Sequence, residues 1–286
     1  MIETQNLTRS VRTTIQTGLT MQYQDELAAA REAAARASEL LRREYETFTA
    51  IPDAPVTIST HADKASQELI LAFLHEKFPN DALCAEESTP AFDSLPKAGA
   101  RTWVVDPIDG TRGFARKTGQ FSVMIGLLVD RKPVVGVVAE PALHRVTFGS
   151  RGGGCWTHLA DTEPVRCHVS ARGFADLVLI QSWAKTGMSP KPVKALTPAK
   201  VIETYSGGVK LAAVARGEAD VYANTYETFF DWDICAGHVL VTEAGGTVTD
   251  LRGEPITYQN DNFAQKGGLI ATNGLIHAEA VKRLAL

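Results

Sequence analysis

Two carboxylates in the segment at residues 103–111 are the clearest candidates in the chain for a chemical role. Asp106 and Asp109 lie three residues apart, in a turn that directly follows the apolar run at residues 102–105. Mg2+ prefers hard oxygen ligands in near-octahedral geometry and keeps several of its waters. The two side chains, with a backbone carbonyl between them, therefore offer ligands for two ions. Asp-Pro and Asp-Gly are also common turn formers, so the segment alone equally fits a simple turn.

Three further acidic sites strengthen the metal interpretation. Asp63 opens a predicted helix, Glu86 and Glu87 end a predicted strand, and Asp233 directly precedes a predicted helix. Each has an ordinary structural explanation, because Asp63 and Asp233 suit helix N-caps and Glu86-Glu87 suits a solvated pair. A cluster of four or five carboxylates repels itself unless cations are bound.

A second group of residues is placed to contact a substrate. Gly207 and Gly208, after Ser206, either bring backbone N–H groups near a ligand or form a tight strand-to-helix turn. Lys210 supplies a counter-charge for a phosphate, or is a solvated lysine on a helix's first turn. His238 is interpreted as a packing residue rather than a catalytic base.

The elements that position these residues follow from the hydrophobic pattern. Helices are predicted at residues 25–48 and 63–77, and short strands that end in acids at 82–85 and 102–105. A hairpin is predicted from residues 122–128 and 133–140, continued by strands at 146–148 and 154–156. Beyond residue 165, strands at 177–180 and 221–222 alternate with helices at 209–215 and 234–243. We expect a polar extension at residues 1–24 and two halves, 25–160 and 161–286.

Composition and charge exclude several classes of function. The chain has 286 residues, 44% of them hydrophobic, and a net charge of −4, so polymeric nucleic acid is not an expected partner. Four scattered cysteines without a CxxC pair predict neither a zinc site nor disulfides. No run approaches the roughly 20 apolar residues that cross a bilayer, and no secretory signal is visible, so we expect no membrane partner and a cytoplasmic location.

The acidic motifs, taken in order, resemble those of the inositol monophosphatase superfamily of lithium-sensitive, metal-dependent phosphatases. The motifs are Asp63, Glu86-Glu87-Ser88, Asp106-Pro-Ile-Asp109-Gly-Thr111 and Trp232-Asp233, and the resemblance spans roughly residues 25–275. It implies an α/β fold layered as an αβαβα sandwich, two or three Mg2+ ions, and sometimes a homodimer.

The resemblance also implies roles for individual residues. The implied metal ligands are Glu86, Asp106, the carbonyl of Ile108, Asp109 and Asp233. Thr111, with Asp63 or Glu86, is implied to activate the attacking water. The implied substrate contacts are Gly110, Thr111, Ser206, Gly207, Lys210 and Asp233.

Within the superfamily, three segments resemble the 3'(2'),5'-bisphosphate nucleotidases, which convert 3'-phosphoadenosine 5'-phosphate to AMP and phosphate. They are residues 109–121, 209–222 and 232–238. One departure is that Ala223-Asn224 stands where that branch has a basic residue; Arg112, Arg116 and Lys117 are alternative sources of positive charge. Inositol 1-phosphate and histidinol phosphate are alternative substrates. The alternative from another class is a non-catalytic module that binds a phosphorylated metabolite.

Overall fold

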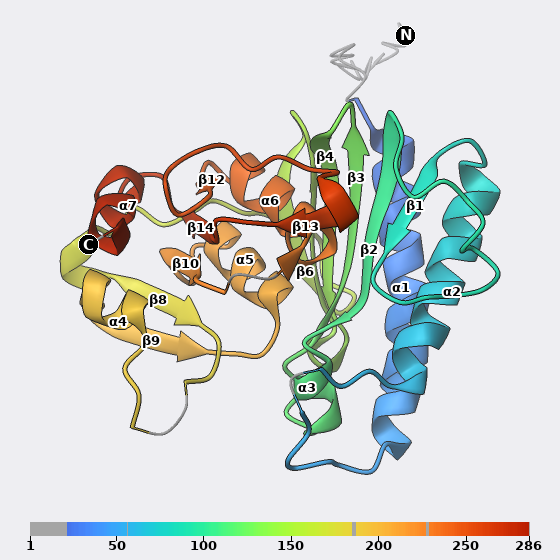
Figure 1. Ribbon diagram of the computed structural model, residues 1–286, viewed down its shortest axis with the longest axis horizontal. Coiled ribbons are helices and arrows are strands. Elements are labelled where there is room, and N and C mark those ends of the chain that lie inside the picture. The colour runs from blue at the N-terminus through green and yellow to red at the C-terminus, as the bar shows by residue number, and fades with distance from the viewer. Residues whose placement is uncertain (1–21, 56, 185–186, 227–228, 286) are drawn as a thin grey trace, which may run out of the picture.

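The chain folds into five alternating layers of helix and sheet (Figure 1). The computed structural model describes residues 22–55, 57–184, 187–226 and 229–285. The order of layers confirms the predicted αβαβα sandwich. Most of the predicted polar extension, residues 1–21, lies outside the described residues, and the first helix begins at Gln24.

The first layer consists of helices α1 (Gln24–Thr47) and α2 (His61–Lys77). Both were predicted from their apolar periodicity. Alanines at residues 29, 30, 33, 34 and 37 recur on one face of α1 and are buried; their small side chains let α1 pack closely on strands β3 and β4. Helix α2 lies beside α1 and contacts β2.

The second layer is a sheet of seven strands in chain order. The strands are β1 (Ala82–Ala85), β2 (Arg101–Asp109), β3 (Ser122–Val129), β4 (Lys132–Glu140), β5 (Arg145–Ser150), β6 (Gly154–Leu159) and β7 (Val165–Arg166). Strand β1 is parallel to β2, and the other pairs are antiparallel. The predicted β3–β4 hairpin is present. Its two connecting residues, Asp130 and Arg131, have φ of 48° and 60°, as a type I′ turn requires.

The central layer, α5 (Gly207–Ala215) and α6 (Asp231–Glu243), covers the other face of this sheet (Figure 1). Two glycines of the sheet let α6 approach. A Cβ atom on Gly136 would lie 2.2 Å from the carbonyl oxygen of Ala236, and one on Gly126 would lie 2.6 Å from Sγ of Cys235. The position of α6 therefore depends on the absence of side chains at these two strand positions.

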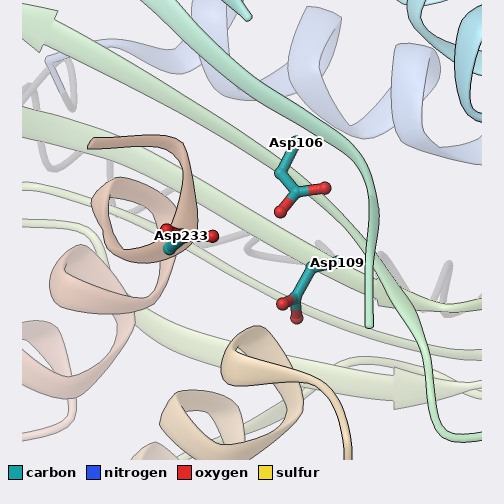
Figure 2. A group of neighbouring side chains, drawn as sticks. All are labelled: Asp106, Asp109 and Asp233. Atoms are coloured by element: carbon teal, nitrogen blue, oxygen red, sulfur yellow. The ribbon is translucent and has the colours of Figure 1, made fainter. Parts of the chain in front are cut away.

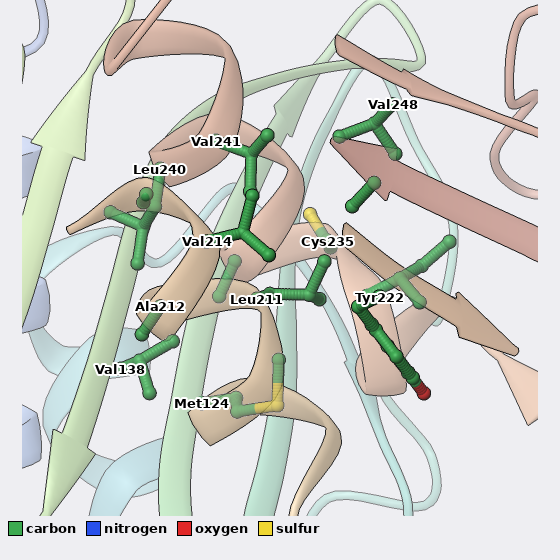
Figure 3. Packing of buried hydrophobic residues seen from close by; sticks show 14 of the residues in the cluster. Met124, Val138, Leu211, Ala212, Val214, Tyr222, Cys235, Leu240, Val241 and Val248 are labelled. Atoms are coloured by element: carbon green, nitrogen blue, oxygen red, sulfur yellow. The ribbon is translucent and has the colours of Figure 1, made fainter. Parts of the chain in front are cut away.

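Figure 3 shows how the central layer fills the core. Met124 and Val138 of the large sheet meet Leu211 and Ala212 of α5, with Leu240 of α6 beside them. These side chains are buried and belong to one continuous hydrophobic cluster. The cluster reaches both sheets, because it also contains Tyr222 and Val248.

The fourth layer is a five-stranded sheet, ordered β12-β14-β10-β8-β9. Its strands are β8 (Val178–Gln181), β9 (Lys200–Glu203), β10 (Val221–Asn224), β12 (Thr247–Thr249) and β14 (Leu269–Thr272). Helices α4 (Lys191–Leu196) and α7 (His277–Ala285) form the last layer and pack against each other. Short elements complete the chain: α3 (Thr111–Ala115), η1 (Pro141–Leu143), η2 (Phe174–Asp176), β11 (Phe229–Phe230), η3 (Asp261–Phe263) and β13 (Ala264–Gln265).

The predicted division near residue 160 stays a proposal. The large sheet continues through β7 to Arg166, and α5 and α6 contact strands of both sheets. Of the second half, the sequence analysis predicted β8, α5, β10 and α6, but not α4, β9, β12, β14 or α7.

Candidate active site

A β-bulge in strand β2 brings its two carboxylates to one side of the sheet. Asp106 lies opposite Met124 and Asp109 lies opposite Ser122, so three residue steps on β2 match two on β3. In a regular strand, residues three apart point to opposite faces. The extra residue reverses this alternation. Both carboxylates therefore share the face on which Met124 packs against the central helices.

The turn after β2 depends on glycine. Gly110 has φ of 85°, and a Cβ atom there would lie 2.9 Å from the carbonyl oxygen of Gln120. At Gly113 the same carbonyl would be 2.2 Å from a Cβ atom. A side chain at either position would displace the turn that carries Asp109 and Thr111.

Three carboxylates converge in front of this turn (Figure 2). Oxygens of Asp106, Asp109 and Asp233 all lie within 4.8 Å of one another, although Asp233 comes from α6, more than 120 residues later in the sequence. Asp106 is 2% exposed, and its Oδ1 accepts no hydrogen bond from any described residue. A buried, unpaired carboxylate oxygen requires a proton or a cation. This donor set fits a hard divalent cation such as Mg2+.

The electrostatics of the cluster agree with that fit. Burial, together with the charges of Glu86 and Asp109, raises the pKa of Asp106 well above its usual value. Burial also raises the pKa of Asp233 to about 7; the hydrogen bond from the Phe230 amide opposes the rise, Asp109 adds to it, and Lys210 opposes it. Without a cation, part of this cluster holds protons near neutral pH.

Asp109 is held in place by four hydrogen-bond donors. Its Oδ1 accepts from the amide of Gly207 at 3.0 Å, and its Oδ2 accepts from the amide of Gly208 at 2.7 Å and the hydroxyl of Ser122 at 3.1 Å. The hydroxyl of Ser206 also donates to Oδ2. The carboxylate thus lies at the N-terminus of α5, where the helix dipole favours negative charge.

These contacts change the interpretation of Ser206 and Gly207. The sequence analysis expected both to contact a substrate, but their donors are directed at Asp109. Gly207 still lines the pocket around the carboxylates. As substrate contacts, both residues stay a prediction.

Two other predicted ligands, Glu86 and Ile108, line the same pocket but stand outside the group of three. Desolvation and the charges of Asp233 and Asp63 raise the pKa of Glu86 to about 8; the residue is exposed, so solvent screens part of this effect. The carbonyl of Ile108 accepts a hydrogen bond from Thr111 Oγ1 at 2.9 Å. Their role as metal ligands stays a prediction.

Thr111 and Asp63 form a hydrogen-bonded pair beside the cluster. Thr111 Oγ1 lies 2.9 Å from Asp63 Oδ1 and the same distance from the carbonyl of Ile108. Asp63 Oδ2 accepts from the amide and hydroxyl of Thr60, at 2.7 and 2.6 Å. Helix α2 begins at His61 rather than at the predicted Asp63, and its N-cap is Thr60, so Asp63 is the third helical residue of a capping box and also the partner of Thr111. Burial raises its pKa, and these hydrogen bonds oppose the rise.

Two basic side chains share the pocket with the carboxylates. Lys210 is 2% exposed, so it is not the solvated lysine that the sequence also allowed. Its Nζ donates to the carbonyl of Tyr205 at 3.3 Å. Burial lowers its pKa to about 8, and Asp109 and Asp233 oppose that shift. Arg112 lines the pocket with a buried Nε that has no hydrogen-bond partner among the described residues.

Several other predictions have a structural outcome. His238 Nδ1 lies 2.8 Å from the hydroxyl of Tyr258, and burial lowers its pKa to about 4, so it packs as a neutral residue, as expected. Gly152 and Gly153 lie in the turn between β5 and β6, and Gly154 begins β6. All four cysteines lie in the described part of the chain, and they are buried and free. No helix among the residues described has the length and apolarity to span a bilayer.

Comparison with known proteins identifies the family of this chain. The model of the inositol monophosphatase family matches residues 22–285. The chain belongs to this family. Its members are metal-dependent phosphatases that hydrolyse phosphomonoesters, so the chain is an enzyme that acts on small phosphorylated substrates. This finding argues against the non-catalytic binding module.

Individual family members carry different substrate names. Histidinol-phosphatase of Mycobacterium tuberculosis is 31% identical over 267 residues, which cover 91% of this chain and 98% of that protein. The 3'(2'),5'-bisphosphate nucleotidase CysQ of Salmonella typhimurium is 31% identical over 216 residues, with 75% and 84% covered. The solved inositol monophosphatase of Anabaena is 29% identical and superposes with a TM-score of 0.74, with 92% and 96% covered. Identity therefore does not distinguish among the three substrates.

Proposed function

We propose that this enzyme is an Mg2+-dependent 3'(2'),5'-bisphosphate nucleotidase that converts 3'-phosphoadenosine 5'-phosphate to AMP and phosphate. The observation that supports it most is a pair of basic side chains in the same pocket as the carboxylates: Lys210, which is buried, and Arg112, which is partly exposed and has a buried Nε without a hydrogen-bond partner among the described residues. A substrate with a second phosphate has an anion beyond the one that is cleaved. Arginine and lysine are the side chains that bind such groups.

The same two cations disfavour the alternatives. Histidinol phosphate carries an ammonium group on its leaving part, which Arg112 and Lys210 would repel. The leaving part of inositol 1-phosphate is a neutral polyol, which carries no second anion for Arg112 and Lys210 to bind. Asn224 stands where the nucleotidase branch has a basic residue; its Oδ1 accepts from the amide of Tyr226 at 2.9 Å. We assign the missing positive charge to Arg112.

In the proposed reaction, Asp106, Asp109 and Asp233 hold Mg2+, with Glu86 and the carbonyl of Ile108 as further ligands. The bound metal supplies Lewis acidity, which favours water deprotonation and stabilises charge on the phosphoryl and leaving oxygens.

In the proposed reaction, Thr111 and Asp63 accept the proton of the attacking water. Thr111 Oγ1 has one hydrogen and two acceptors in reach, Asp63 Oδ1 and the carbonyl of Ile108. When its hydroxyl donates to Asp63, its lone pairs are free to accept from the attacking water. The proton of that water then passes through Oγ1 to Asp63, whose raised pKa suits a base. Glu86 is the alternative acceptor.

A substrate panel tests the proposal. Phosphate release is measured from 3'-phosphoadenosine 5'-phosphate, inositol 1-phosphate and histidinol phosphate, each with Mg2+ and with EDTA. We expect the highest kcat/KM for the bisphosphate and no release in EDTA. A higher kcat/KM for either of the other esters would overturn the substrate assignment.

A matched pair of variants tests the role of the cation. Lys210→Met keeps the length of the side chain and removes its charge, and Lys194→Met makes the same change at an exposed position of α4. We expect Lys210→Met to lower kcat/KM for the bisphosphate relative to 3'-AMP about tenfold or more, and Lys194→Met to leave the ratio unchanged. The Li+ sensitivity and the homodimer implied by the resemblance stay predictions.

A further inference from the structure

The pocket around the carboxylates has an aromatic wall. Seven of its 24 lining residues are aromatic, against 7% of the whole chain. They are Trp183, Tyr205, Tyr222, Tyr226, Phe229, Phe230 and Trp232. The faces of such rings bind neither Mg2+ nor phosphate. The wall therefore faces the part of the substrate that is not phosphate.

Tyr226 and Trp183 have the most exposed side chains among the seven aromatic residues of this wall, at 60% and 49%, and Trp183 is the one hydrogen-bonded to Gln120. Guanidinium groups of Arg112 and Arg116 lie 5.7 and 5.8 Å from the ring centre of Tyr205, which is partly buried. The Trp183 side chain, by contrast, is 49% exposed. The two ring centres are 6.2 Å apart, which is less than the roughly 7 Å needed to insert a further ring between them. The space between the two rings is therefore too narrow for a ligand ring, which leaves the outer face of Trp183 as the face on which one could stack.

Trp183 is hydrogen-bonded to Gln120, a residue that packs against the turn carrying Asp109. Its Nε1 donates to Oε1 of Gln120 at 2.8 Å, and the amide of the next residue, Ala184, donates to Glu203 of β9 at 3.1 Å. The backbone carbonyl of Gln120 is the group that lies against Gly110 and Gly113. One residue thus connects the indole ring to the turn that carries Asp109.

We propose that Trp183 is a specificity-determining residue that stacks with the aromatic base of the substrate's leaving group, and that Gln120 is its positioning residue. This inference rests on the proposed function, because it assumes a phosphate ester of a nucleoside. Stacking on an aromatic side chain tolerates any base, since every base has a π-face. The enzyme therefore selects nucleotides over phosphate esters without an aromatic ring, with little discrimination among bases.

The test compares an ester with a base and one without. The selectivity ratio is kcat/KM for 3'-AMP divided by kcat/KM for glycerol 2-phosphate. We expect Trp183→Ala to lower this ratio about tenfold, which corresponds to the usual strength of base stacking, and Trp183→Phe to restore most of it. Leu159→Ala is the control, because Leu159 is 52% exposed and lies outside the pocket; it leaves the ratio unchanged. An unchanged ratio in Trp183→Ala, or an equal loss for both esters, would overturn the inference.

Gln120→Leu separates positioning from a structural role. We expect it to raise the KM for 3'-AMP more than the KM for glycerol 2-phosphate. Equal changes in both constants would show that Gln120 only supports the fold of the turn.

A binding measurement separates this inference from the proposed function. AMP titrated with Mg2+ quenches tryptophan fluorescence in the wild type, and we expect most of that quenching to be absent in Trp183→Phe. Unchanged quenching in that variant refutes the stacking role even if the bisphosphate is the best substrate. A preference for histidinol phosphate together with lost quenching refutes the proposed function alone.

Discussion

Removal of Mg2+ makes the stability of this enzyme depend on pH, and Asp233 sets the size of the effect. The pKa of its carboxyl group rises from 3.8 to about 7 in the fold. Between these values the folded protein holds a proton that the unfolded chain has released. The free energy of unfolding therefore falls as pH rises through this window, and the full stability is present below the unfolded pKa.

The magnitude follows from the shift. Each pH unit in the window costs about 1.4 kcal/mol, which gives about 3 kcal/mol between pH 5 and pH 7. The side chain is partly accessible, so we expect about 1.5–3 kcal/mol, or about 3–8 °C in Tm. Asp106 and Asp63 shift in the same direction and add to the fall.

Thermal unfolding between pH 5 and pH 8, in EDTA and in saturating Mg2+, measures this effect. We expect a falling Tm in EDTA and a much flatter profile with Mg2+, because the cation replaces the proton. Asp233→Asn keeps an acceptor for the Phe230 amide and flattens the EDTA profile, whereas the exposed Asp176→Asn does not. Parallel profiles with and without Mg2+ would refute the reasoning.

Three further predictions follow from single contacts. Thr111→Ala lowers kcat about 100-fold or more, and Thr111→Ser, which keeps the hydroxyl, retains most of it; full activity in the alanine variant would exclude the proton path. Asp106→Asn raises the Tm of the Mg2+-free enzyme at pH 8, because it removes a buried carboxyl group that lies near Glu86 and Asp109 and whose Oδ1 has no hydrogen-bond partner among the described residues; a lower Tm contradicts this. Gly136→Ala destabilises the fold by about 1–3 kcal/mol in urea unfolding, since its Cβ atom would meet the carbonyl of Ala236; an unchanged midpoint would disprove this close contact.

Local patterns predicted much of the fold. Helices α1 and α2 carry their own apolar periodicity, and the β3–β4 hairpin has a polar turn between two β-rich runs. The layered sandwich came from the order of the acidic motifs, not from periodicity. In the second half, β12 and β9 were missed because strands of three or four residues carry little pattern, whereas β8, equally short, was predicted from its continuous apolar run.

The acidic residues of the site were predicted from the sequence, but the residues that hold them in place were not. The bulge in β2 has one sequence signal, Pro107 inside a strand. Nothing in the sequence links Ser122 to Asp109 or Gln120 to Trp183, because these contacts join segments that meet only in the folded chain. Helix α6 begins at Asp231 rather than at the predicted residue 234, and this places Asp233 inside the first turn.

Phosphate release by the wild type and by Asp106→Asn tests the central claim most directly. Asparagine fits the site without losing a hydrogen bond at Oδ1, which has no partner among the described residues, so a loss of activity reports on the metal site. We predict that the wild type releases phosphate only with Mg2+, that EDTA stops release, and that the variant is at least about 1,000-fold slower while it remains folded. Wild-type turnover in Asp106→Asn, or release that persists in EDTA, would contradict the account.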